Sequence, residues 1–374
     1  MTTTHPALSP TRLADLELPN QLVVAPMTRV SAQEDGVPTQ DMVDYYAEYA
    51  AGGWGLIITE GIYTDTLYSQ GYHNQPGLAV PDHTEGWRRV TQAVHSAGGR
   101  IFAQLMHAGA LSQGNPYKAE TVAPSAVRPR GEMMPEYGGS GPWPTPREMT
   151  AEDIESAVQG FADAALAARD AGFDGVEVHA ANGYLLDQFL TDYTNHRDDE
   201  YGGPVTNRVR IVAEAVARIR KQVGDEFPLG VRLSQGKVND SAYRWPDGAR
   251  TAEAIFTAVA GVGASHLHVA SEGRDWIESA RLDGGATVTG LARRVTGLPV
   301  IANGGMHDPG QAARVLDDGH ADLLSLGRGA LANPDYPRRL ASGEPLAAFD
   351  HGMLEPFATL ANARRRRADG ERGR

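Results

Sequence analysis

Eight short apolar runs, each bounded by glycine, proline or polar residues, constrain the fold of this chain more than any other feature. They are LVVAPM (22–27), GLIITEG (55–61), IFAQLMH (101–107), GVEVHAA (175–181), LGVRLS (229–234), HLHVAS (266–271), PVIANGG (299–305) and LLSLGRG (323–329). Most of them are apolar almost throughout, which is typical of strands that are buried on both faces. The runs therefore predict a parallel sheet covered by other elements.

Most gaps between these runs carry a helical pattern. The clearest, over 150–172, begins with Thr150 as N-cap and Asp153 three residues later, repeats apolar residues at helical spacing and stops at Gly172. Similar segments cover 82–99, 205–224, 251–263, 286–298 and 308–321. This alternation predicts an α/β fold of the (β/α)8 TIM barrel type. A doubly wound sheet is the alternative, but the first run lacks the G-x-G-x-x-G turn of that fold.

One segment interrupts the alternation. Residues 114–147 are rich in proline and glycine and have no helical period. Because they follow the third strand, they would lie at the carboxy-terminal mouth of the barrel, so we predict a capping insertion that acts as a lid. We assign 1–360 to a single domain and 361–374, which contains the run RRRR, to a flexible basic tail.

The composition excludes several classes of protein. A formal net charge of -13 argues against a nucleic-acid surface, and the absence of cysteine excludes disulfides, thiolate zinc sites, cysteine-bound iron–sulfur clusters and cysteine nucleophiles. The chain has no apolar run of membrane-spanning length, and its start, MTTTHPALSP, resembles no secretion signal. We expect a cytoplasmic protein with a small-molecule substrate, no metal, no nucleic-acid partner and no membrane partner, as a monomer or homodimer.

Residues suited to catalysis or ligand binding lie at the ends of the predicted strands. They are Thr28, Arg29, Gly61, Gln104, His107, His179, Asn182, Tyr184 and Arg232. The last two strands end in glycine-rich turns at 303–305 and 326–329, a pattern that in barrels binds phosphate through backbone N–H groups, to which Arg328 can add a charged donor. Each residue alone also has a structural explanation, such as a buried amide for Gln104 or a packed ring for His179. On a barrel, however, all of them face one mouth.

Six segments resemble the Old Yellow Enzyme family of FMN-dependent ene-reductases. They are APMTR (25–29), TEG (59–61), GGRIFAQLMHAG (98–109), GVEVHAANGYLLDQFLTDYTNHRDDEYGG (175–203), VRLS (231–234) and SLGRGALANPDYP (325–337). The resemblance covers nearly the whole chain in a consistent order, and the block 175–203 is the most specific. It implies an FMN-binding barrel over 1–360 with NAD(P)H as reductant.

The resemblance also implies which positions contact FMN. These are Ala25, Pro26, Met27, Thr28, Gly61, Gln104, Arg232, Asn303, Gly304, Gly305, Gly327 and Arg328. Thr28 would lie near flavin O4, Gln104 at the pyrimidine edge and Arg232 beside N1 and O2, where a fixed cation favours the reduced anion. The glycine-rich turns and Arg328 would hold the phosphate.

The remaining matches concern the substrate. His179 and Asn182 correspond to the pair that binds the oxygen of an activated alkene, Tyr184 to the donor that protonates the α carbon, and Met106 to a position that shapes the pocket. Hydride would then add to the β carbon of an α,β-unsaturated carbonyl or nitro compound.

The chain departs from better-known members in several places: Met106 replaces a tryptophan of one branch, and Thr28 and Asn182 replace a cysteine and a second histidine of another. The segment 234–250 also differs, and the aromatic that often lines the pocket has no aligned counterpart, Phe357 being one candidate.

Three alternatives stay open at this point. One is the same FMN barrel acting on another acceptor, such as a nitro compound or nitrate ester, or run as a dehydrogenase. Another is a flavin-free phosphosugar isomerase or aldolase, which predicts a catalytic lysine on a strand, although none of the eight runs contains one. The third is a flavin-binding protein without catalysis.

Overall fold

The computed structural model describes residues 5–270, 276–282 and 284–372. Parts of the sequence predictions lie outside these residues: positions 1–4, 271–275 and 283 of the predicted domain, which include Ser271 at the end of the sixth run, and 373–374 of the predicted tail.

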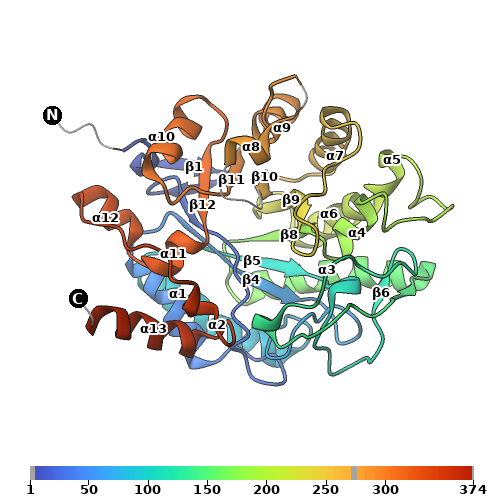
Figure 1. The fold of residues 1–374 in the computed structure, drawn as a ribbon, viewed down its shortest axis with the longest axis horizontal. Coiled ribbons are helices and arrows are strands. Elements are labelled where there is room, and N and C mark those ends of the chain that lie inside the picture. The colour runs from blue at the N-terminus through green and yellow to red at the C-terminus, as the bar shows by residue number, and fades with distance from the viewer. Residues whose placement is uncertain (1–4, 271–275, 283, 373–374) are drawn as a thin grey trace.

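Eight parallel strands form a closed barrel (Figure 1). In chain order they are β3 (Leu22–Val24), β4 (Leu56–Tyr63), β5 (Ile101–Met106), β8 (Gly175–Asn182), β9 (Leu229–Lys237), β10 (His266–Ala270), β11 (Val300–Asn303) and β12 (Leu323–Leu326). The barrel closes where β12 pairs with β3, with Leu324 opposite Leu22. Every predicted run overlaps one of these strands, so the TIM barrel is confirmed.

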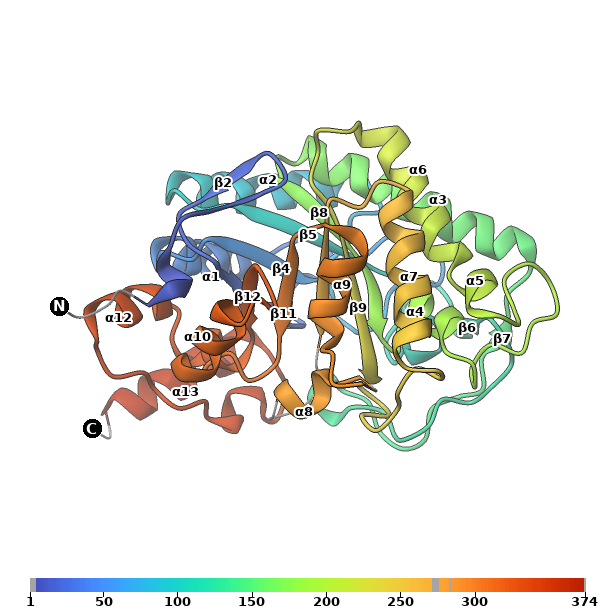
Figure 2. The same cartoon turned by 90° about the horizontal axis from the view of Figure 1, so that it is seen from above.

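Helices surround the barrel (Figure 2). The longer ones are α1 (Gln40–Ala51), α2 (Pro81–Ser96), α3 (Ala151–Asp170), α6 (Arg210–Val223), α7 (Ala249–Gly261), α9 (Val288–Thr296) and α10 (Pro309–Asp317); shorter ones are α4 (Leu185–Leu190), α5 (Val205–Arg208), α8 (Trp276–Ala280), α11 (Arg328–Ala332) and α12 (Tyr336–Ser342). The predicted cap of α3 is present, because the Thr150 hydroxyl accepts from Asp153 N and the Asp153 carboxylate accepts from Thr150 N. Helix α1 is one that the apolar pattern did not reveal.

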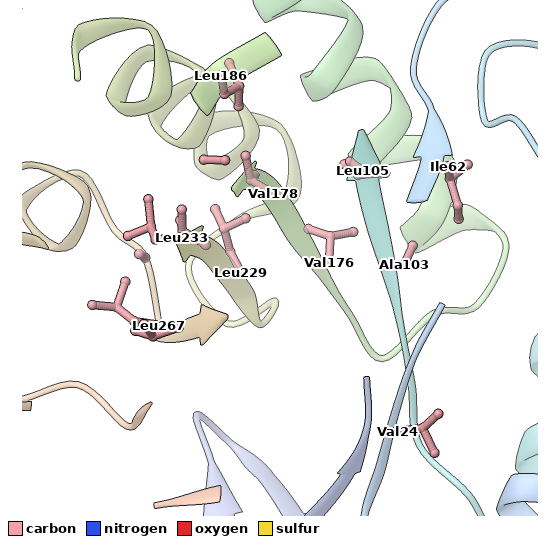
Figure 3. Close-up of a cluster of buried hydrophobic side chains, with 14 of the residues drawn as sticks. Val24, Ile62, Ala103, Leu105, Val176, Val178, Leu186, Leu229, Leu233 and Leu267 are labelled. Carbon is pink, nitrogen blue, oxygen red and sulfur yellow. The ribbon is translucent and has the colours of Figure 1, made fainter. Parts of the chain in front are cut away.

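The period of two along each strand separates the core from the site. On β8, Val176 and Val178 point outward into the apolar layer beneath the helices, as Figure 3 shows in part, and Leu233 on β9 does the same. Their inward-facing neighbours are polar and buried, among them Glu177 and Arg232. The outward set therefore stabilises the fold, and the inward set supplies the chemistry.

A hairpin of β1 (Thr11–Leu13) and β2 (Leu16–Leu18) packs against the amino-terminal part of the barrel. Leu13 and Leu18 join a buried cluster with Val23, Phe102 and Ile301. This hairpin was not predicted, because its strands are too short to show a period. It blocks one end of the barrel, which leaves the opposite end for the site.

The insertion at 114–147 contains no α-helix; it holds β6 (Val122–Ala123), a 3-10 turn at Pro135–Tyr137 and the start of β7 (Arg147–Glu148). Met133, Met134 and Tyr137 pack against a buried cluster that contains Tyr72 and Tyr184. The insertion therefore borders the candidate site. Its action as a lid remains a prediction.

The carboxy-terminal segment differs from the predicted flexible tail. Residues Leu360–Arg372 form helix α13, which lies beside α1. Arg364 pairs with Asp41 at 2.5 Å, and Arg367 pairs with Glu48 at 3.0 Å. The arginines thus meet the acidic face of α1 instead of extending into solvent, a long-range complementarity that the local run RRRR does not reveal.

Within the part of the chain that the structure describes, no helix combines the length and the apolar character needed to cross a membrane.

Candidate functional site

A cavity of about 610 Å³ opens at the carboxy-terminal ends of the barrel strands. All of the positions that the resemblance implies for cofactor or substrate line it: Ala25, Pro26, Met27, Thr28, Gly61, Gln104, Met106, His179, Asn182, Tyr184, Arg232, Asn303, Gly304, Gly305, Gly327 and Arg328. They come from seven strands or the turns that follow them. Segments far apart in sequence are therefore brought together by closure of the barrel.

His179, Asn182 and Tyr184 occupy the end of β8 and the turn after it. Asn182 has φ 63° and Gly183 has φ 90°, a left-handed pair that asparagine and glycine tolerate best. This turn brings the rings of His179 and Tyr184 edge to face, with centroids 4.9 Å apart. The Tyr184 hydroxyl lies 2.5 Å from that of Tyr72. Three polar groups therefore face one part of the cavity.

His179 is electrically neutral at physiological pH. Burial, and next the charge of Arg232, lower its pKa well below the ordinary value. Arg232 is its ladder partner on β9, which explains their proximity. A neutral imidazole carries one N–H and one lone pair. Its Nδ1 has no hydrogen-bond partner among the described residues, so this ring has capacity left for a ligand.

Beneath these residues, a polar network crosses the barrel interior. Gln104 Nε2 donates to Glu177 Oε1 at 2.7 Å, Glu177 Oε2 lies 2.7 Å from His268 Nδ1, and His268 Nε2 lies 2.8 Å from Ser325 Oγ. Burial raises the pKa of Glu177, but His268 and then Arg232 outweigh it and bring the pKa to about 2. Glu177 is therefore a carboxylate that orients the Gln104 amide, with the nitrogen toward the core.

The opposite end of the cavity carries two glycine turns and an arginine, groups that could hold an anion. Gly304 and Gly305 have φ 119° and 67°, backbone conformations that other residues rarely adopt. A Cβ on Gly327 would still have room, since its nearest neighbour would be Met27 Sδ at 3.5 Å. Arg328 is exposed and forms no ion pair with any described residue. A phosphate needs this combination of backbone donors and a free cation.

Gly61 marks a place where only backbone fits. A Cβ there would lie 2.6 Å from Met106 Sδ. The ladder between β4 and β5 is also irregular between Ile58 and Gly61. The backbone of Gly61 thus borders the cavity directly, as a close approach to a flat ring system requires.

A family model described as the NADH:flavin oxidoreductase / NADH oxidase family matches residues 8–347. The chain belongs to this family. It is 35% identical over 341 residues to the NADH oxidase of Thermoanaerobacter brockii, covering 89% of this chain and 50% of that protein, so it spans about half the length of that relative. It is 35% identical over 350 residues to a "Probable flavin mononucleotide-dependent alkene reductase" of Leishmania infantum, covering 91% of each.

Among solved structures, the old yellow enzyme homologue from Zymomonas mobilis superposes with a TM-score of 0.84 at 33% identity, covering 94% of this chain and 98% of that one. The resemblance to the Old Yellow Enzyme family is therefore confirmed, and the protein is an FMN-dependent oxidoreductase whose reductant is NAD(P)H. The cavity fits this family's cofactor: its volume lies within the roughly 300–1,000 Å³ of cofactor pockets. Glycine turns and Arg328 line one end of the cavity, and the polar network that contains Gln104 lies at the other end.

Two candidates from the sequence lie differently from their predicted places. His107 is buried outside the cavity lining, where its Nδ1 accepts from Gly109 N at 3.1 Å. Phe357 is 51% exposed, and Phe349 and Leu354 line the cavity instead. Strand β5 ends at Met106, so His107 lies just beyond the strand and not on it. Phe357 follows the segment that returns over the barrel.

Strand β9 is longer than its apolar run and ends at Lys237, so a strand does carry a lysine. Lys237 does not line the cavity and pairs with Asp187 at 2.6 Å. It is therefore not placed as the nucleophile of an aldolase. The extension of β9 to Lys237 was not predicted, because the sequence GKVND has no apolar run. The extra residues instead form an irregularity in the ladder after Leu233.

Several cavity residues were missed by the sequence analysis: Tyr137, Val238, Ser241, His307, Phe349, His351 and Leu354. Most lie in the loops after β5 and β9 or in the segment after α12. Val238 directly follows the end of β9, but that end lies beyond the apolar run, and the others do not follow a strand end directly, so no local pattern distinguishes them. For Tyr72, which contacts Tyr184, the glycine- and proline-rich stretch QGYHNQPG after β4 was the available signal.

Proposed function

We propose that this protein is an ene-reductase, which reduces the double bond of an alkene conjugated to a carbonyl or nitro group. The observation that supports it most is the placement of His179, Asn182 and Tyr184 in one turn that lines the cavity with the implied FMN positions. When bound, FMN would supply the redox chemistry that links NAD(P)H to the β carbon.

The residues that would hold FMN form three groups. Ala25 to Thr28 and Gly61 would offer backbone and a hydroxyl to the ring system, and Gln104 would present its amide to the pyrimidine edge. Arg232 would place a guanidinium where reduction develops negative charge. The glycine turns at 303–305 and 327, with Arg328, would bind the phosphate.

His179 and Asn182 would bind the oxygen of the carbonyl or nitro group. When hydride reaches the β carbon, negative charge develops on that oxygen. Two preorganised donors stabilise it, and each such donor is commonly worth about 3 to 4 kcal/mol. Because the pKa of His179 is lowered, it acts as a neutral N–H donor and needs no proton uptake from solvent.

Tyr184 would protonate the α carbon. Burial, and next the neighbouring Tyr184, raise the pKa of Tyr72 well above its ordinary value, so Tyr72 keeps its proton at neutral pH. Tyr72 can therefore donate to the Tyr184 oxygen and stabilise the phenolate left after proton transfer. The Tyr184 proton is then available to the substrate.

Sequential anaerobic spectroscopy tests the proposal. The purified protein is expected to be yellow, to lose its flavin absorbance with NADH or NADPH, and to recover it when cyclohexenone is added. Recovery with oxygen but with no alkene or nitroalkene would exclude ene reduction and favour the alternative acceptors.

Arg328→Gln is expected to weaken FMN binding by about 10- to 100-fold, since a charge-assisted hydrogen bond contributes about 1.5 to 3 kcal/mol. Titration of the apoprotein with FMN, followed by flavin fluorescence, measures this. Arg314→Gln is the matched control, because Arg314 is also exposed but lies on α10 outside the cavity. Equal loss in both variants would contradict the phosphate role.

A further inference from the structure

A buried ion pair lies directly behind the turn that carries Asn182 and Tyr184. Lys237 Nζ is 2.6 and 2.7 Å from the two carboxylate oxygens of Asp187. The side chains are 1% and 0% exposed. Neither residue lines the cavity, so the roles described above do not account for them.

Both members of the pair are tied to the turn. Asp187, in the first turn of α4, accepts a hydrogen bond from Gly183 N at 2.7 Å with the same carboxylate. Lys237 is the ladder partner of Asn182, and the next residue, Val238, donates its N–H to Asn182 O at 3.1 Å. The ion pair thus joins the two sides of the turn, one through the helix and one through the strand.

An irregularity in β9 brings Lys237 to this place. The ladder pairs Ala180 with Leu233 and then Asn182 with Lys237, so β9 has extra residues between the two pairs. Ser234 Oγ accepts from Asn182 N at 2.8 Å and donates to Gly236 O at 2.7 Å, which closes the irregularity. Such features re-aim side chains next to active sites.

A side chain on Gly183 would be crowded on this side of the turn. A Cβ on Gly183 would lie 2.8 Å from Asn239 Oδ1 and 3.3 Å from Lys237 Cβ. On its other side, the segment after Lys237 reaches the cavity, which Val238 and Ser241 line. A shift of the Lys237 side chain would therefore be transmitted to the turn and to the cavity wall.

Stability alone gives little reason for such a pair. Taking two charges out of water costs so much that a buried ion pair is often no more stable than well-packed apolar residues. Lys237 has a further interaction, with its Nζ 4.7 Å from the centre of the Tyr243 ring. The carboxylate of Asp187 and the ring of Tyr243 thus both hold the Lys237 ammonium group at one position.

We propose that Lys237 and Asp187 are positioning residues for proton transfer: their ion pair holds the Asn182–Gly183–Tyr184 turn so that the Tyr184 hydroxyl meets the α carbon. The inference rests on the proposed role of Tyr184 as proton donor. It adds that two residues outside the cavity set the aim of that donor.

The test compares two acceptors, one that needs a proton donor positioned at carbon and one that does not. In the FMN-loaded full-length enzyme, Lys237→Met is expected to slow cyclohexenone reduction by about tenfold or more, since small misplacements near a reacting centre can cost up to about 100-fold. Menadione reduction is expected to stay within about twofold, because a quinone is protonated on oxygen, which water can do. In a Tyr184→Phe background, Lys237→Met should cause no further loss with cyclohexenone.

Product stereochemistry gives a second readout. With 2-methylcyclohexenone, the face of protonation sets the configuration of the α carbon. A misplaced Tyr184 leaves protonation partly to water, so Lys237→Met should lower the enantiomeric excess of the product. Tyr243→Phe is the matched control: it removes a hydrogen bond to Asp192 beside the same ammonium and keeps the ion pair, so rate and enantiomeric excess should be unchanged.

The outcomes separate the proton-donor role of Tyr184 from the positioning role of the ion pair. If Tyr184→Phe slows reduction of cyclohexenone and of menadione equally, Tyr184 is no proton donor, and both roles are excluded. If Tyr184→Phe discriminates between them but Lys237→Met slows both equally, or leaves enantiomeric excess unchanged, only the positioning role fails. If Lys237→Met does not fold, Lys237→Arg is measured instead, and an unchanged ratio of the two rates overturns the inference.

Discussion

Tyr184→Phe is expected to slow alkene reduction by about 100- to 10,000-fold, the usual contribution of a placed general acid. The substitution removes one oxygen, and the ring can keep its edge-to-face contact with His179. Reduction of the bound flavin by NAD(P)H should change little, because that step needs no proton from Tyr184. Stopped-flow measurement of the two half-reactions separates them.

Tyr72→Phe is the informative companion. It removes the hydroxyl that lies 2.5 Å from the Tyr184 oxygen but leaves Tyr184 itself. We expect a smaller loss in alkene reduction, about tenfold, since one hydrogen bond to a developing charge is removed. If Tyr184→Phe were no more harmful than Tyr72→Phe, or slowed both half-reactions alike, the proton would come from another group.

The barrel could be predicted from the sequence because its signal is local and repeated. Each buried strand is an apolar run, and the alternation of strand and helix is visible in composition alone. Site positions at strand ends follow from the same pattern: Gly61, Gln104 and Arg232 needed only correct strand assignments. Their assignment to FMN came from the resemblance.

What the sequence did not show depends on contacts between distant segments. The irregularity that places Lys237 beside Asp187 depends on pairing between β9 and β8. The positions of Phe349 and Leu354 at the cavity depend on packing of their segment over the barrel. The tail became a helix because arginines such as Arg364 meet acidic residues of α1. No local pattern encodes such pairings.

The charge state of His179 could not be predicted from the sequence either. His179 and Arg232 are 53 residues apart in the sequence, yet the ladder places them opposite each other. That neighbour and burial determine that the imidazole is neutral. A donor that holds no charge before the reaction can stabilise a charge that appears during it, which is what an alkene reductase requires.

His179→Ala and Asn182→Ala are therefore each expected to slow alkene reduction by about 100- to 1,000-fold, the cost of losing one donor to a developing oxyanion. If both donors contact the same oxygen, their effects are coupled, and the double variant should lose less than the product of the two single losses. Rates of cyclohexenone reduction by the wild type, the two single variants and the double variant complete this double-mutant cycle. Fully multiplicative losses would indicate that the two residues act at separate places.

The pH dependence provides an independent check on His179. Because its folded pKa is depressed, the neutral ring persists as the pH falls through about 6.5, where an ordinary histidine gains its proton. Between pH 8 and 6 the alkene step of the wild-type enzyme should therefore show no inflection that His179→Ala removes. Removal of the Arg232 charge by Arg232→Leu should raise the His179 pKa and bring its titration toward this window, which NMR of the imidazole can follow. An imidazole that already titrates near pH 6.5 in the wild-type protein would show that His179 does not act as a neutral donor.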